Sequence, residues 1–391
     1  MNLSDYKKEC SNLIKFVELI TSEIKCNEDK KEKWASFKNK NENVIRKLLN
    51  ITNEEIQNPC NLVSFDIEKE RKLLLLNYTA QAHNVLHVYE NGWSNEIKLC
   101  RGLVFSFENK VKIISRSFEK FFNANEMTIN TFESLQKNFD SKKLFNVYEK
   151  LDGHMIEYFS INNELYSTTR GKFNTASAQE SLNLMTKKEF NLCKSDLKKY
   201  YNIDLMSIIV ELVTPSTEVL VKYNGEKSIY ILAMYDINGD KINYQYLDFV
   251  SSYFNFSKLP ERRQYTIPQI LKEIKRRDID NHEGWVLDLN GTLLKFKYNN
   301  YIGLMVSSKL SYKYLMQRKM TSTTNKMIST LNQEKLEEAL TLLSNIEKKV
   351  VECKKISSYK PLYELWSDEE GGLSYFRTVC RKFYKTFIVC N

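Results

Sequence analysis

The distribution of glycine constrains the fold of this chain more than any other sequence feature. Glycine is absent from residues 1–91 and from residues 305–370, and each of these stretches contains a single proline. Such stretches favour helices, whereas the segment between them alternates short β-rich runs with turns. We therefore predict an α+β chain in three parts: a helical N-terminal extension over 1–60, a β-rich domain over 61–304 and a helical C-terminal domain over 305–391.

Apolar residues recur at helical spacing in both terminal parts, as expected for helices that bury one face. The predicted buried positions are Leu13, Val17, Ile20 and Ile24 in a first helix, Val44, Leu48 and Ile51 in a second, and Leu336, Leu340, Leu343, Ile346 and Val350 in a C-terminal helix that Asn332 would cap.

The composition describes a globular chain that is large enough for more than one domain. It has 391 residues, of which 42% are hydrophobic and 27% are charged, and its formal net charge is +9. This charge suits a polyanionic ligand but does not by itself establish nucleic acid. No run approaches the length of a membrane-spanning helix, so we expect neither a signal peptide nor a membrane partner.

The cysteine and histidine content bears on the compartment and on metal binding. Eight cysteines are scattered through the chain, without the spacing of a metal site or of a disulfide scaffold. A reducing, intracellular (cytoplasmic) setting is therefore expected. The chain has only four histidines, so we do not expect a histidine-rich metal site. Nothing in the sequence fixes the oligomeric state.

The segment Tyr148–His154 contains the first candidate for chemistry. Here Lys150 is followed by Asp152 and Gly153, with β-rich segments on both sides. A lysine amine can attack the α-phosphate of a nucleotide only when the amine is neutral. Burial or cationic neighbours favour the neutral amine, whereas an arginine side chain stays protonated. Gly153 would allow a tight turn near phosphate, and Asp152 could fix the lysine or a ribose hydroxyl. Taken alone, this segment is better interpreted as a solvated charged turn.

Strands are predicted on both sides of the lysine segment, and one of them contains a carboxylate. Glu211 lies inside the apolar run 207–212, where a solvated face is not expected, so we predict a partnered or functional acid. The other predicted strands are 103–107 and 111–114, which form a hairpin, 144–149, 154–161 and 164–169, which turn at Asn162-Asn163, and 228–236.

A second predicted hairpin places two lysines together. Asn290-Gly291 separates the apolar runs 283–289 and 293–298, a strong hairpin signal. Because side chains alternate along a strand, Lys295 and Lys297 lie on one face. Two adjacent cations repel each other unless a polyanion lies between them, so we predict a phosphate site here, with a solvated strand edge as the alternative.

These pieces occur in one order along the chain: Arg101-Gly102, Lys120-x-Phe122, Lys150-x-Asp152-Gly153, Glu211, Glu283-Gly284 and Lys295-x-Lys297. This order resembles the covalent nucleotidyltransferases. In detail, the segments 101–105 and 115–123 are similar to those of the phage-type RNA ligase 1 family. The resemblance covers about residues 95–304. It implies that 61–304 is an adenylyltransferase domain built from ATP-grasp-like antiparallel sheets.

The resemblance implies a role for each residue. Lys150 would carry AMP, while Glu211 and Glu283 would hold a hydrated Mg²⁺ or Mn²⁺ ion on the α-phosphate. Lys295 and Lys297 would stabilise charge on the transferred phosphate. The other implied contacts with ATP come from Arg101, Lys120, Phe122, Glu149, Asp152, Gly153, Arg170, Gly284 and Tyr301.

The implied activity is ATP-dependent joining of RNA 5′-phosphate and 3′-hydroxyl ends through lysyl-AMP and RNA-adenylate, in the repair of RNA such as tRNA. A separate end-healing kinase or phosphatase could prepare the ends. Two positions depart from the family: His154 replaces a small hydroxyl residue and Arg170 replaces a lysine. The alternatives are a DNA ligase, an mRNA-capping guanylyltransferase, and an RNA-binding protein with a decayed pocket. Both enzymes usually carry a β-barrel after Lys-x-Lys, where this chain continues with helical sequence.

Overall fold

The computed structural model of the chain is a mixed α+β structure with three sheets, as the sequence predicts. It describes residues 3–26, 37–87, 89, 92–276, 278–308, 331 and 333–353. The chain forms two compact units, of which the first contains residues 1–274 and 282–296 and the second contains residues 275–281 and 297–391. All three sheets lie in the first unit, apart from the last residue of one strand.

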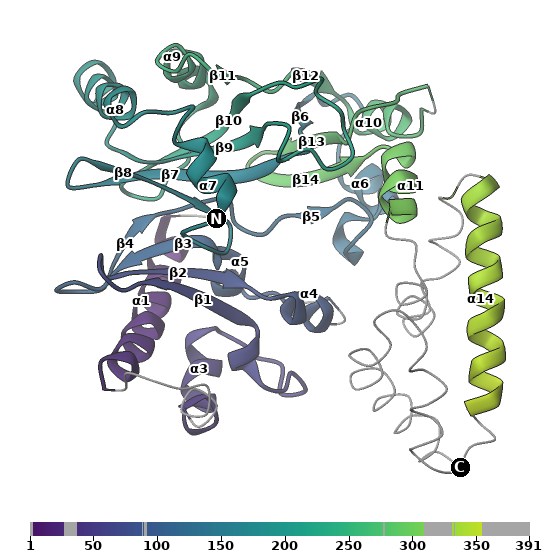
Figure 1. Ribbon diagram of the computed structural model, residues 1–391, viewed down its shortest axis with the longest axis horizontal. Coiled ribbons are helices and arrows are strands. Elements are labelled where there is room, and N and C mark those ends of the chain that lie inside the picture. Colours follow the sequence, from purple (N-terminus) through teal and green to yellow (C-terminus); the bar gives the residue numbers. More distant parts are fainter. Residues whose placement is uncertain are drawn as a thin grey trace. The chain divides into compact units, whose positions relative to one another are not determined.

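A four-stranded antiparallel sheet, in the order β1-β2-β3-β4, opens the β-rich part (Figure 1). Its strands are β1 (Val63–Glu68), β2 (Leu73–Tyr78), β3 (Arg101–Ser106) and β4 (Lys112–Ser115). Strands β3 and β4 pair antiparallel, which confirms the first predicted hairpin. Four consecutive leucines of β2 are buried, so both faces of this sheet are covered.

Two five-stranded sheets follow. The second sheet has the order β11-β10-β9-β7-β8, and the third has the order β12-β6-β13-β14-β5. The strands of the second are β7 (His154–Ile161), β8 (Glu164–Thr169), β9 (Leu205–Val213), β10 (Ser228–Asp236) and β11 (Ser257–Lys258). Those of the third are β5 (Phe122–Asn123), β6 (Phe145–Lys150), β12 (Arg262–Tyr265), β13 (Gly284–Leu289) and β14 (Thr292–Lys297).

Helices cover these sheets. Those described in the first unit are α1 (Leu3–Cys26), α3 (Glu42–Leu48), α4 (Ala80–Leu86), α5 (Asn95–Leu99), α6 (Phe132–Asn138), α7 (Ala176–Ser181), α8 (Lys187–Tyr201), α9 (Leu247–Ser251) and α10 (Ile267–Glu273), with short 3-10 turns η1 (Pro59–Asn61), η2 (Thr128–Asn130) and η3 (Tyr244–Tyr246). The second unit contains α11 (Asn299–Ser308) and α14 (Gln333–Cys353). Among the described residues, no helix has both the length and the apolar character needed to cross a bilayer.

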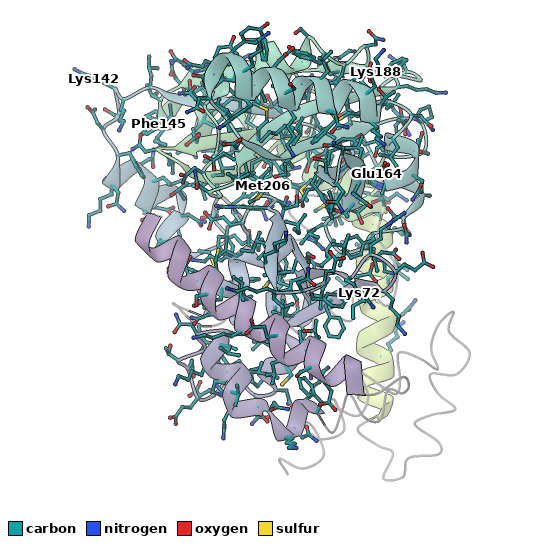
Figure 2. The ribbon with its side chains drawn as sticks, turned by 90° about the vertical axis from the view of Figure 1, so that its left-hand side faces the viewer. Lys72, Lys142, Phe145, Glu164, Lys188 and Met206 are labelled. Atoms are coloured by element: carbon teal, nitrogen blue, oxygen red, sulfur yellow. The ribbon has the colours of Figure 1, made fainter. Side chains whose placement is uncertain are left out.

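Each of two sheets builds a separate core with its own helices. Helix α1 packs beside α5 and β4, and its residues Leu13, Val17 and Ile20 are buried as predicted. Helix α8 begins at a capping box formed by Thr186 and Glu189. It buries an apolar stripe against the second sheet, while its outer face, marked by Lys188 in Figure 2, is exposed.

Two details of the predicted helix faces were wrong. Val44 is 48% exposed, and its neighbour Ile45 is 1% exposed, because Ile45 and Leu49 are the residues of this segment that pack into the first core. In α14, Leu340 is 50% exposed. The proposed cap at Asn332 and the side chains of Ile24, Ile346 and Val350 lie outside the described residues.

Candidate active site

The Lys150 amine lies at the end of β6, where the third sheet brings it opposite β13. Antiparallel pairing places Gly284 directly across from Lys150. Lys150 Nζ is 2.7 Å from Glu283 Oε2, and the two side chains are 20% and 4% exposed. The residue ahead of the lysine, Glu149, has its carboxylate 3.5 Å from the ring of His282. A buried ion pair therefore positions the amine.

Gly153 follows the lysine at the closest approach of two strands. A Cβ atom on Gly153 would lie 2.4 Å from the carbonyl oxygen of Leu212, so only glycine fits there. Its backbone N–H donates to Glu211 Oε1 at 3.2 Å. This close approach brings the predicted strand carboxylate beside the lysine segment.

Asp152 binds the loop that follows β9. Its Oδ2 atom accepts hydrogen bonds from the backbone N–H groups of Leu220 and Val221 at 2.8 and 2.9 Å. The Asp152 backbone N–H in turn donates to the hydroxyl of Tyr223. These bonds fix the loop after β9 against the turn that follows Lys150.

Glu211 is held where two charges of opposite sign act on it. Burial raises the pKa of its carboxyl to about 7, an effect that Glu283 increases and that Lys150 and the Gly153 N–H oppose. The two acids are therefore close enough to repel each other. A cation between them would relieve that repulsion.

These residues border a cavity of about 450 Å³ in the first unit. Seven of the predicted site residues line it, namely Arg101, Glu149, Lys150, Gly153, Arg170, Glu211 and Lys295. His154, one of the two departures from the family, also lines it. Apolar walls come from Phe118, Phe121, Leu151, Met155, Leu232 and Val286. The cavity therefore combines an apolar surface with several cations.

Two of the cations that line this cavity lie near the same aromatic ring. Lys295 Nζ lies 4.3 Å and the Arg101 guanidinium 5.5 Å from the ring centroid of Phe121. Burial, together with Arg101, Lys120 and Lys150, lowers the pKa of Lys295 well below its usual value. This concentration of positive charge suits a polyanion such as a polyphosphate.

Lys120 and Phe122 occupy the neighbouring segment. Lys120 Nζ lies 4.3 Å from the Phe122 ring centroid and 5.5 Å from that of Trp93. The lysine side chain is buried, which is rare for a lysine without a specific role. Arg170 donates to the hydroxyl of Tyr78 at 3.2 Å and lies over the same ring. Aromatic faces thus hold two further cations.

The last two predicted residues belong to the second unit. Lys297 ends β14, and its Nζ atom lies 5.0 Å from the ring centroid of Tyr301. Tyr301 is buried in α11.

Two groups were not singled out from the sequence. Glu157 on β7 is fully buried, and it accepts a hydrogen bond from Ser115. The sequence pattern that could have indicated Glu157 is the one that indicated Glu211, an acid inside an apolar strand. The second group is formed by His83, His87 and Glu126, whose side chains meet although 39 residues separate the last two in the sequence. Only the four-residue spacing of the histidines could have indicated it.

A comparison with protein families decides the assignment. Residues 99–314, more than half of the chain, match the family model described as RNA ligase. The chain belongs to the RNA ligase family. The predicted membership of the phage-type RNA ligase 1 family is thus confirmed. The matched segment includes every residue proposed for the site.

A curated relative gives the same result. The chain is 26% identical over 272 residues to a protein of Autographa californica nuclear polyhedrosis virus named for a bifunctional polynucleotide kinase/RNA ligase. The match covers 65% of this chain and 37% of the relative, so the chain spans little more than a third of that protein.

Solved structures of RNA ligases are also similar to this member of the RNA ligase family. An archaeal ATP-dependent RNA ligase matches with a TM-score of 0.49 and 13% identity, covering 79% of this chain and 82% of that one. A Naegleria gruberi RNA ligase, solved with ATP and Mn, matches with a TM-score of 0.35 and 18% identity, covering 47% and 57%. The family assignment rests on the sequence match over residues 99–314.

Proposed function

We propose that the protein is an ATP-dependent RNA ligase that joins 5′-phosphate and 3′-hydroxyl ends through lysyl-AMP and RNA-adenylate. The observation that carries this proposal is the Lys150 amine, which lies in a cation-rich cavity and is held by Glu283 at 2.7 Å. A nucleophilic lysine needs a positioned amine and a pocket that favours the charged phosphates of its substrate.

In the first step, the neutral Lys150 amine attacks the α-phosphorus of ATP. A nitrogen–phosphorus bond forms, the bond from the α-phosphorus to the bridging oxygen breaks, and pyrophosphate leaves. The amine loses its proton, and Glu283 is within hydrogen-bond distance to accept it. Glu149, beside the lysine on β6, would meet the adenine amino group, and Gly284, which pairs with Lys150, would keep β13 close to β6.

The cations would bind the phosphates. Lys295 and Lys297 would stabilise the negative charge that is redistributed when pyrophosphate leaves. Arg101, Lys120 and Phe122 would contact the triphosphate and the nucleoside. The remaining proposed contacts are Arg170 at the ribose or phosphate, Tyr301 behind the lysine pair, and Asp152 and Gly153, which shape the turn after the nucleophile.

Glu211 and Glu283 fit a divalent cation. Both are carboxylates, the ligand type that Mg²⁺ and Mn²⁺ prefer, and they repel each other in the structure. When bound there, Mg²⁺ or Mn²⁺ would act as a Lewis acid on a phosphate oxygen. The Glu211 carboxylate is oriented for this by the N–H of Gly153.

The later steps use RNA. AMP passes from Lys150 to an RNA 5′-phosphate, and a 3′-hydroxyl then attacks that phosphate and expels AMP. The name of the baculovirus relative combines a kinase with a ligase, which supports a kinase or phosphatase preparing the ends on which this chain acts. We assign the chemistry to residues 61–304, between a helical extension (1–60) and a helical C-terminal domain (305–391).

The test is to offer the purified protein, with Mg²⁺ and either ATP or GTP, five acceptors: single-stranded RNA, nicked duplex RNA, cleaved tRNA, nicked DNA and RNA with a 5′-diphosphate end. We expect joining of at least one RNA, with ATP. Joining of DNA alone would establish a DNA ligase, and transfer of GMP to a 5′-diphosphate RNA would establish a capping enzyme. Specific RNA binding without any covalent chemistry would indicate a decayed pocket.

A further inference from the structure

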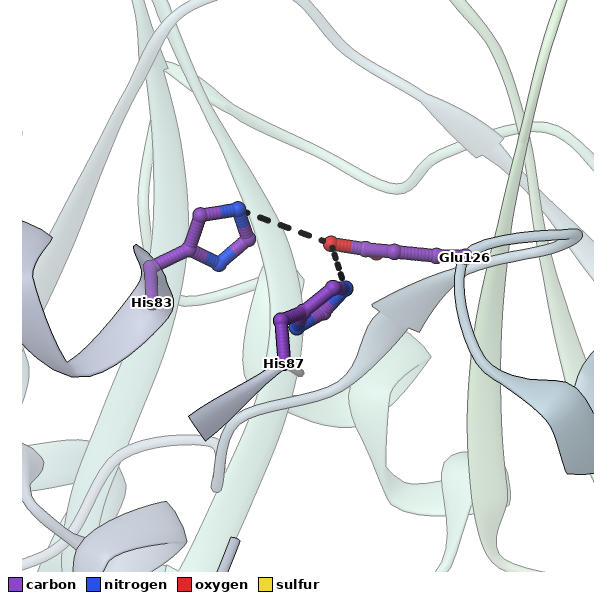
Figure 3. A group of neighbouring side chains, drawn as sticks. All are labelled: His83, His87 and Glu126. Carbon is purple, nitrogen blue, oxygen red and sulfur yellow. Dashed lines mark ion pairs between the residues drawn. The ribbon is translucent and has the colours of Figure 1, made fainter. Parts of the chain in front are cut away.

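Two histidines and a glutamate converge on one another (Figure 3). His83 lies on α4, and His87 follows one helical turn later at its C-terminal cap. Residues four apart on a helix share one face, so both rings point the same way. Glu126 comes from the turn after β5, and its Oε1 atom is 3.8 Å from His83 Nε2 and 3.3 Å from His87 Nε2.

The geometry of these three atoms is that of ligands around a common point. His87 Nε2 is buried and makes no hydrogen bond in the described part of the chain, although Glu126 Oε1 is only 3.3 Å away. The nitrogen is therefore not aimed at that oxygen. All three ligand atoms lie within 4.8 Å of one another. In a tetrahedral zinc site, ligand atoms that are each about 2.1 Å from the ion lie about 3.4 Å from one another. Small side-chain movements would bring these three atoms to that separation.

The carboxylate is held in place before any ion arrives. Glu126 Oε2 accepts hydrogen bonds from the backbone N–H and the side-chain amide of Asn123, the latter at 2.8 Å. This leaves Oε1 facing the two rings. Such a supporting hydrogen bond is what orients ligands in protein metal sites.

We propose that His83, His87 and Glu126 bind a divalent transition-metal ion, with zinc as the best match. Imidazole nitrogen suits zinc and its neighbours, whereas Mg²⁺ prefers oxygen ligands alone. Two histidines and one carboxylate leave one coordination position for water or another ligand. Its three ligands are different residues from Glu211 and Glu283, the pair proposed for Mg²⁺ or Mn²⁺.

The ring of His87 also links the site to a fluorescent side chain. Trp93 donates a hydrogen bond to His87 Nδ1 at 3.4 Å, a long and therefore weak bond. Coordination through Nε2 places the proton of the ring on Nδ1, so this bond is lost when metal binds. We expect the indole emission of Trp93 to change on metal binding.

The test is titration of the chelator-treated full chain with Zn²⁺ and with Co²⁺, following metal content, Co²⁺ absorption and indole emission. One tight ion per chain is expected. His83→Ala and His87→Ala should each lower the affinity at least about tenfold. The matched controls are His154→Ala, a histidine outside the group, and Glu211→Gln, which alters the other proposed metal site. Both should bind zinc as the wild type does.

Glu126→Gln keeps the shape of the side chain, so a loss of zinc binding in this variant cannot be attributed to misfolding. We expect it to retain the wild-type circular dichroism spectrum and to bind zinc more weakly, so that the emission change appears only at higher zinc concentrations. The proposal is overturned if wild-type protein binds no more zinc than the His83→Ala/His87→Ala double variant. It is equally overturned if Glu126→Gln and the wild type give the same binding curve, or if His154→Ala weakens binding as much as His87→Ala.

Discussion

Two acids lie on the same face of the second sheet but have different neighbours. They are Glu211 on β9 and Glu157 on the adjacent strand β7. The register pairs Met155 with Glu211 and Glu157 with Ile209, so both carboxylates project from the same side of the sheet. Burial is the main cause of a raised pKa at both, to about 7 for Glu211 and about 8 for Glu157. Their neighbours differ, however.

Glu211 borders the cavity and interacts with Lys150 and Glu283, whereas Glu157 lies beneath β3 and β4. The Ser115 hydroxyl donates to Glu157, and a Cβ on Gly102 would come within 3.0 Å of its Oε2 atom. Burial alone therefore does not distinguish a reactive acid from a structural one. The distinction comes from access to the cavity and from the partners.

The largest predicted difference between the two acids is in adenylylation. Glu211→Gln and Glu283→Gln should each lower the rate of protein–AMP formation at least about 100-fold, because each removes a charge at the reacting phosphate. Glu157→Gln should change that rate less than about threefold, since its acid is already neutral at pH 7. Single-turnover adenylylation at pH 7 measures all three. Equal losses in Glu157→Gln and Glu211→Gln would remove the distinction.

Next in size is the effect of Gly153→Ala, which forces β7 and β9 apart beside Glu211. The added Cβ would lie 2.4 Å from the Leu212 carbonyl oxygen, so we expect a loss of about 2 kcal/mol in the free energy of unfolding. Gly171→Ala is the control. Its Cβ would meet the side-chain amide of Asn77 at 3.1 Å, which can move, so the loss should be smaller. Denaturant unfolding that ranks the two variants in the opposite order would contradict the close approach.

The smallest predicted effect is a pH dependence of stability at Glu157. Folding raises its pKa from the ordinary value of a glutamate to about 8, so the folded state favours the neutral acid. The stability that this group contributes is present below its unfolded pKa and is lost as pH rises through about 8. Glu157→Gln should therefore match the wild type near pH 4.5 and exceed it by at least about 1 kcal/mol near pH 9. Thermal unfolding across this range checks it, and a constant difference would refute it.

Much of the fold and of the proposed site could be predicted because the signals are local. Glu211 was predicted because it is an acid inside an apolar strand. The hairpin that contains Lys295 was predicted from the turn sequence Asn290-Gly291. Contacts between elements distant in sequence could not be predicted in this way. The approach of Glu126 to His87, and of Ser115 to Glu157, depends on how strands and helices pack. The burial of Ile45 in place of Val44 was missed for the same reason, because it depends on how α3 packs into the first core.

The measurement that tests the central claim most directly is transfer of labelled nucleotide to the protein. Purified protein is incubated with α-labelled ATP and Mg²⁺, and the modified residue is located by peptide mass spectrometry. The account predicts one AMP per chain, on the side chain of Lys150, and none in Lys150→Ala. Absence of label from the wild type, or label of equal extent in Lys150→Ala, would contradict it.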